Sequence, residues 1–100
     1  MSKILITGSG KGLGLALHDA LKEQGHLIYD YDINDNADVR NPDFLDSIQE
    51  LDILINNAGV NIIDWLENFT EEQWDKVMDT NAKGIFKMTQ ACLPMLIKSK

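Results

Sequence analysis

Short apolar runs recur along this chain, and each is long enough for a β-strand but too short for a helix. In the run Ile53-Leu54-Ile55, apolar residues follow one another without alternation, which is typical of a strand buried on both faces of a parallel sheet. The predicted strands are residues 3–7, 27–32, 37–39 and 52–56.

Between these strands, apolar residues recur at helical spacing. The pattern predicts a helix that follows the first strand and ends at Gly25. It predicts a second helix that begins at Pro42. A long third helix is predicted over residues 71–97, because Thr70-Glu71-Glu72-Gln73 has the pattern of a capping box. Pro94 removes one intrahelical hydrogen bond and is expected to kink this helix near its end.

Strands that alternate with helices predict an α/β fold with a doubly wound parallel sheet and helices on both faces. Right-handed crossovers then order the predicted strands 3-2-1-4. The order reverses between the first and fourth strands, so a ligand crevice is expected at their carboxyl ends. One hundred residues allow one such domain, covering 1–100.

The first strand leads directly into a glycine-rich turn, Thr7-Gly8-Ser9-Gly10-Lys11-Gly12-Leu13-Gly14. Glycines let a backbone approach a pyrophosphate closely, and the first N–H groups of the following helix point at the phosphates. The turn is not a Walker loop, because Lys11 is followed by Gly12 instead of Ser or Thr. A tight turn also needs glycine for steric reasons, so this feature alone indicates a dinucleotide site only weakly.

Acidic side chains lie at the carboxyl end of the predicted second strand. Asp32 stands 24 residues after Gly8, where a carboxylate accepts both ribose hydroxyls of an adenosine and repels a 2′-phosphate. Asp32 therefore favours NAD. One alternative is that Asp32 only caps the turn after the strand, and another is that Asp30 is the carboxylate that binds the ribose. Lys11 favours NADP instead, because a base in the glycine turn can pair with a 2′-phosphate, so NADP stays the alternative cofactor.

Two further motifs lie where the crevice is expected. Asp38-Val39 fits a position that holds adenine through the carboxylate and the next backbone N–H, although a short strand ending in Asp is common without that role. Asn56-Asn57-Ala58-Gly59 follows the last strand. Its small residues let the backbone pass a ribose, and Asn56 is expected to tie the strand ends together, although the motif also fits an ordinary turn.

Composition narrows the classes of partner. The net charge of −7 argues against a nucleic acid or an anionic membrane surface, because both would be repelled. The first residues hold no signal-peptide core and no run long enough to span a bilayer, which favours a cytoplasmic location. Cys92 lies within the predicted long helix and is expected to be a buried thiol, and His18 and His26 have no ligand cluster around them, so no metal site is predicted.

Taken together, these motifs resemble the short-chain dehydrogenase/reductase family in order and approximate spacing, over essentially the whole chain. The resemblance implies a Rossmann-type fold and an NAD(P)-dependent oxidoreductase that moves hydride between the nicotinamide and a carbonyl or alcohol substrate. It implies a part for Asn81 in the proton relay and homo-oligomerisation through the helix at 71–97. The cofactor-binding residues that it implies are Thr7, Gly8, Ser9, Lys11, Gly12, Leu13, Gly14, Asp32, Asp38, Val39, Asn56, Asn57, Ala58 and Gly59.

The sequence departs from this family in its catalytic residues. The family's proton donor is a Tyr followed four residues later by a Lys, with a Ser upstream, but Ile33 follows Tyr29 at that distance and Asp35 follows Tyr31. We therefore expect residues 1–100 to form the cofactor-binding first half of the fold and to be inactive alone. The alternatives are a dinucleotide-binding module without catalysis and a truncated, non-functional fragment.

Overall fold

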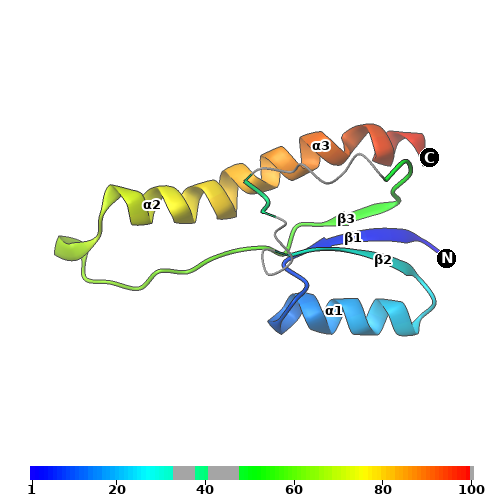
Figure 1. Cartoon of the computed structure of the whole chain (residues 1–100), viewed down its shortest axis with the longest axis horizontal. Coiled ribbons are helices and arrows are strands. Elements are labelled where there is room, and N and C mark those ends of the chain that lie inside the picture. The colour runs from blue at the N-terminus through cyan, green and yellow to red at the C-terminus, as the bar shows by residue number, and fades with distance from the viewer. Residues whose placement is uncertain (33–37, 41–47, 100) are drawn as a thin grey trace.

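A computed structural model describes residues 1–32, 38–40 and 48–99. Its strands are β1 (Lys3–Thr7), β2 (Leu27–Tyr31) and β3 (Ile53–Ile55). They form a parallel sheet in the order β2-β1-β3, with Leu5 of β1 opposite Tyr29 on one side and Leu54 on the other. Helix α1 (Gly12–Glu23) covers one face of the sheet and helix α3 (Gly84–Lys98) covers the other (Figure 1). The parallel α/β sheet and the central place of the first strand are confirmed.

The third predicted strand is wrong where the structure describes it. Asp38 and Val39 lie in a turn, while Ala37 and the helix expected from Pro42 fall outside the described residues. The Asp38 Oδ1 atom accepts the backbone N–H of Arg40 at 2.9 Å. An Asp that bonds its own backbone two residues on favours a turn over a sheet ladder, which explains the difference.

The long helix begins as predicted but is not regular throughout. Its first part, α2 (Glu71–Met78), has the complete capping box: Gln73 N donates to Thr70 Oγ1 at 3.1 Å, and Thr70 N donates to Gln73 Oε1 at 2.8 Å. A π-helical turn over Asp79–Lys83 then separates α2 from α3. Helix α3 continues past Pro94 to Lys98, so the change in helical geometry comes earlier than the proline.

The core lies between α3 and the sheet. Leu5, Leu51, Met88 and Cys92 are at most 1% exposed and belong to one cluster. Burial raises the pKa of the Cys92 thiol to about 11, so the thiol is protonated at neutral pH and serves as a small core residue, as predicted.

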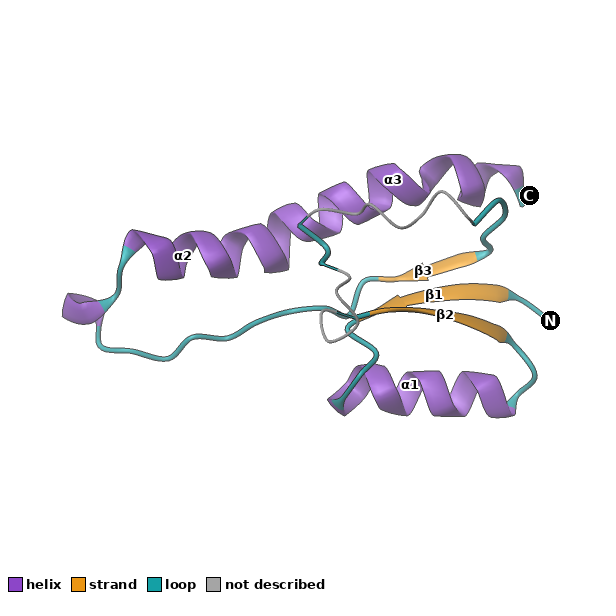
Figure 2. Ribbon diagram, in the orientation of Figure 1, coloured by secondary structure: helices purple, strands orange, loops and turns teal. Residues whose placement is uncertain are grey.

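Helix α2 and the loop before it extend beyond the end of the sheet (Figure 2). In consequence Trp74 of α2 is 60% exposed. Along α3 the predicted apolar stripe is buried in part: Met88, Cys92 and Met95 are buried, whereas Phe86 is 61% exposed. Among the residues that the structure describes, no helix is long and apolar enough to cross a membrane, and no group of three or more His, Cys, Asp or Glu side chains gathers as a metal site.

Candidate functional site: a cavity at the carboxyl ends of the strands

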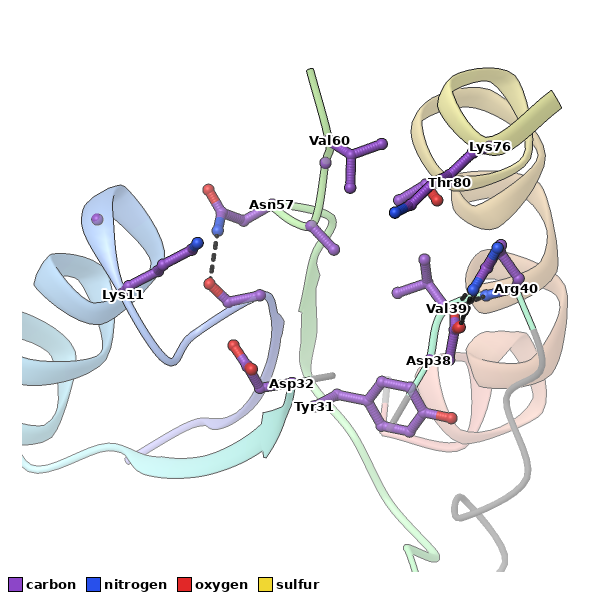
Figure 3. Close-up of a pocket in the computed structure, with 14 residues that line it drawn as sticks. Lys11, Tyr31, Asp32, Asp38, Val39, Arg40, Asn57, Val60, Lys76 and Thr80 are labelled. Carbon is purple, nitrogen blue, oxygen red and sulfur yellow. Dashed lines mark hydrogen bonds and ion pairs between the residues drawn. The ribbon is translucent and has the colours of Figure 1, made fainter. Parts of the chain in front are cut away.

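A cavity of about 300 Å³ opens where the three strands end. The glycine turn after β1, the end of β2 and the loop after β3 line one side of it (Figure 3). The segment 38–40 and the end of α2 line the other side. The sheet therefore brings together, at one edge, motifs that are far apart in the sequence.

The glycines of the turn have different tasks. A Cβ at Gly8 would lie 2.8 Å from the Cα of Ala58, and a Cβ at Gly14 would overlap the carbonyl oxygen of Gly8. These two positions need glycine because the chain segments approach each other closely. Gly12 has a φ of +59° and no atom within 4 Å of its would-be Cβ, so it provides the left-handed turn and leaves open space beside the cavity.

The N-terminal end of α1 reaches the cavity without a side-chain cap. Lys11 is the N-cap residue, makes no side-chain hydrogen bond to the helix, and is followed by no acidic residue in the first turn. The first N–H groups of a helix have no partner inside it, and the helix dipole is positive at that end. Together with the Lys11 side chain at the cavity, this end favours an anion.

The carboxylate within β2 and the carboxylate directly after it have different hydrogen-bond partners. Asp32 is 5% exposed, lines the cavity, and accepts the backbone N–H of Gly10 on Oδ2 at 2.6 Å. Asp30 bonds the Nδ1 atom of His18 on α1 at 2.7 Å and does not line the cavity. The geometry therefore supports Asp32, the first choice from the sequence, over Asp30.

Thr7 joins the end of β1 to the loop after β3. Its Oγ1 atom accepts N–H groups from Asn57 at 3.0 Å and Ala58 at 2.9 Å, and the Asn57 side chain donates to the carbonyl of Gly8 at 3.1 Å. The tie that we expected from Asn56 is made by Thr7 and Asn57 instead. The side chain of Asn56 reaches Thr89 of α3 at 3.3 Å, because neighbouring residues of an extended chain point to opposite sides.

Asn81 lies in the π-helical turn and bonds the loop after β3. Its Oδ1 atom accepts the N–H of Val60 and its Nδ2 atom donates to the carbonyl of Val60, both at 2.8 Å. Both ends of the amide are thus engaged with backbone. The proton-relay part implied for Asn81 stays a prediction, while its positioning of Val60 at the cavity wall is visible.

The opposite wall holds an ion pair. The Asp38 carboxylate accepts from Arg40 Nη2 at 2.7 Å and from Nε at 3.0 and 3.1 Å (Figure 3). The Arg40 side chain beside it lowers the pKa of Asp38 below its usual range. Val39 between them is 6% exposed and packs where Gly84 has no side chain, since a Cβ there would lie 2.7 Å from Val39 Cγ2.

Most of the predicted site residues meet at this cavity. Those that line it are Gly8, Lys11, Gly12, Asp32, Asp38, Val39, Asn57, Ala58 and Gly59. Thr7 and Gly14 support it from behind, whereas Ser9 is buried outside the lining, Leu13 is 68% exposed on α1, and Asn56 points to α3. The sequence reasoning missed the lining residues Tyr31, Arg40, Val60, Lys76 and Thr80. The spacing of four between Lys76 and Thr80 was the available signal for that pair, because it places them on one helical face.

The fold and this cavity define an α/β protein with a glycine-turn crevice at the switch point of a parallel sheet. The chain belongs to the short chain dehydrogenase family, whose model matches residues 27–100.

Curated relatives agree with this family. The chain is 33% identical to 3-ketodihydrosphingosine reductase of Bacteroides thetaiotaomicron, over 97% of this chain and 43% of the relative. It is 30% identical to 3-oxoacyl-[acyl-carrier-protein] reductase FabG of Vibrio cholerae, over 96% of this chain and 50% of the relative. The chain thus spans about half the length of the curated relatives that it matches.

A solved structure shows the same arrangement. Ligand-free aldohexose dehydrogenase of Thermoplasma acidophilum superposes with a TM-score of 0.86 at 25% identity, covering 99% of this chain and 46% of that one.

Proposed function

We propose that residues 1–100 form an NAD(P)-binding domain that holds NAD in preference to NADP. The domain would serve an oxidoreductase that moves hydride between the nicotinamide and a carbonyl or alcohol carbon. The observation that carries the proposal is the convergence of the glycine turn, buried Asp32 and the loop at Asn57–Gly59 on one cavity. Membership of the short chain dehydrogenase family supports the same reaction class.

The residues present fit a dinucleotide. The uncapped first turn of α1 and the open space at Gly12 suit a pyrophosphate, because backbone N–H groups and the dipole face it with no Cβ between. A carboxylate accepts hydrogen bonds on both of its oxygens, and Asp32 lines the cavity, so it suits ribose hydroxyls. Asp38 and the N–H of Val39 would face the adenine. When bound, the nicotinamide supplies the hydride donor or acceptor.

Cofactor choice depends on opposed charges at one end of the cavity. Asp32 is buried, so its repulsion of a 2′-phosphate is screened less by solvent than that of an exposed acid. Lys11 also lines the cavity and acts in the opposite sense. We infer that the buried carboxylate dominates and that NAD binds more tightly than NADP.

Calorimetric titration of both dinucleotides tests this assignment. Asp32→Asn keeps an acceptor for the Gly10 N–H but removes the charge, so the ratio of the two dissociation constants should fall at least several-fold. Asp30→Asn is the matched control, because that acid pairs with His18 outside the cavity and should leave the ratio unchanged. Tighter binding of NADP by the wild type, or an equal ratio in Asp32→Asn, would refute the assignment.

The proton donor for the reaction is proposed to lie outside residues 1–100. Tyr29 and Tyr31 both belong to β2, and although Tyr31 lines the cavity, neither is followed four residues later by a Lys. Two relatives are named as reductases of a 3-keto and a 3-oxo compound, which supports a carbonyl substrate for the whole enzyme. Binding without catalysis is the second candidate, favoured by the absence of a Lys four residues after either tyrosine. Dinucleotide binding with no oxidation of NADH by a panel of ketones is the result expected for these 100 residues.

A further inference from the structure

The wall formed by residues 38–40 is held by contacts of two separate kinds. The first kind fixes its backbone: Lys87 Nζ on α3 donates to the carbonyl of Arg40 at 2.7 Å. Val39 adds to this by packing into the space over Gly84. The position of the segment therefore depends on α3 and not on the Arg40 side chain.

The second kind of contact acts on one side chain. Arg40 donates to both oxygens of the Asp38 carboxylate through Nε, and again to Oδ2 through Nη2. Such a fork fixes the plane of a carboxylate as well as its charge. Asp38 lines the cavity and faces it from the side opposite Lys11 and Asp32 (Figure 3). The fork thus orients an acceptor at the cavity wall.

We propose that Arg40 is a positioning residue for base recognition. By holding the Asp38 carboxylate as a fixed acceptor, it makes the cavity select a purine with an exocyclic amine over a purine with a carbonyl at the same position. This inference rests on the proposed dinucleotide function and adds a residue to it that acts through Asp38.

The selectivity follows from hydrogen-bond chemistry. An ionised carboxylate only accepts, so an adenine amine gains a bond, whereas the carbonyl of hypoxanthine would face it acceptor against acceptor. The hypoxanthine carbonyl would also meet the negative charge of Asp38, whose pairing with Arg40 does not depend on the ligand, so this analogue is repelled without gaining a bond. A fork keeps the carboxylate from rotating towards water. The lowered pKa of Asp38 agrees with this state, since it keeps the group ionised at neutral pH.

The test compares NAD with deamino-NAD, in which hypoxanthine replaces adenine, by calorimetric titration of the chain. The wild type should bind NAD at least about tenfold more tightly, the scale of one charged hydrogen bond. Arg40→Gln should bring the ratio of dissociation constants to within about threefold of unity. Arg40→Lys should recover part of the ratio, because it restores the charge without the fork.

Lys87→Met is the matched control. It removes the bond to the Arg40 carbonyl and leaves the Asp38–Arg40 pair in place. It should weaken both dinucleotides alike and keep their ratio, which is the behaviour of a purely structural contact.

Four results would overturn the inference. Arg40→Gln could weaken both dinucleotides equally and keep the wild-type ratio, which would make Arg40 structural. A rise in the ratio would show that the guanidinium itself contacts the base. A wild type that binds NAD and deamino-NAD equally would remove this inference and leave the proposed function standing, whereas no binding of either would remove both.

Discussion

Replacing Thr7 by Val should destabilise the fold far more than the similar size of the two side chains suggests. Thr7 is 1% exposed, and its hydroxyl accepts the N–H groups of Asn57 and Ala58. Val fills the same volume but leaves both donors without that acceptor. An unsatisfied buried donor costs about 1–3 kcal/mol. Because the loop borders an open cavity that water can reach, we expect about 2–4 kcal/mol for the two together.

This loss is large against a total stability of about 5–15 kcal/mol for a small domain. With a urea slope of about 1.5 kcal/mol per M, the unfolding midpoint should fall by roughly 1.3–2.7 M. The assay is equilibrium urea unfolding followed by far-ultraviolet circular dichroism at one protein concentration. Thr7→Ser is the control, because it keeps the hydroxyl and loses one methyl, worth about 1 kcal/mol. A Val variant as stable as the Ser variant would refute the role given to the hydroxyl.

Two further predictions concern the long helix. Inserting one alanine between Ile85 and Phe86 of helix α3 should rotate α2 and the π-helical turn by about 100° relative to the rest of α3. Lys76 and Thr80 would then leave the cavity, and the NAD dissociation constant should rise at least about tenfold. Circular dichroism should show an unchanged helix content. An unchanged dissociation constant would contradict the placement of these two residues at the binding site. The exposed Trp74 and Phe86 should make the chain associate, so light scattering should give a mass above that of one chain. This mass should be lower for the Phe86→Glu variant. A monomer at every concentration would count against this surface as an interface.

The sequence was informative where structure depends on local pattern. Strands β1 and β3 and the capping box at Thr70 could be predicted because strand formation and helix initiation are set by neighbouring residues. The burial on both faces that we expected for β3 is wrong, because β3 lies at an edge of the described sheet and Ile53 is 43% exposed. The choice between Asp32 and Asp30 could also be ranked, since the glycine turn follows directly on the neighbouring strand. Fold class and most of the cavity lining follow from these elements.

The rest depends on details that periodicity does not contain. The tie that we expected from Asn56 is made by Asn57, because a shift of one residue along an extended chain turns a side chain to the other side. Asp38 forms a turn in place of a strand through a bond to Arg40 that no apolar pattern indicates. Lys76 reaches the cavity from α2, and its direction depends on the helical geometry that follows.

The π-helical turn connects two walls of the cavity. Asn81 within it holds both backbone groups of Val60, and Gly84 directly after it receives Val39. Residues three apart lie on one side of a helix, so a single helical segment contacts the loop after β3 and the segment at 38–40 at the same time. A shift of this turn would therefore move both walls together. The helix accordingly sets the width of the cavity. The loop residues that face a ligand take their positions from backbone contacts to this helix.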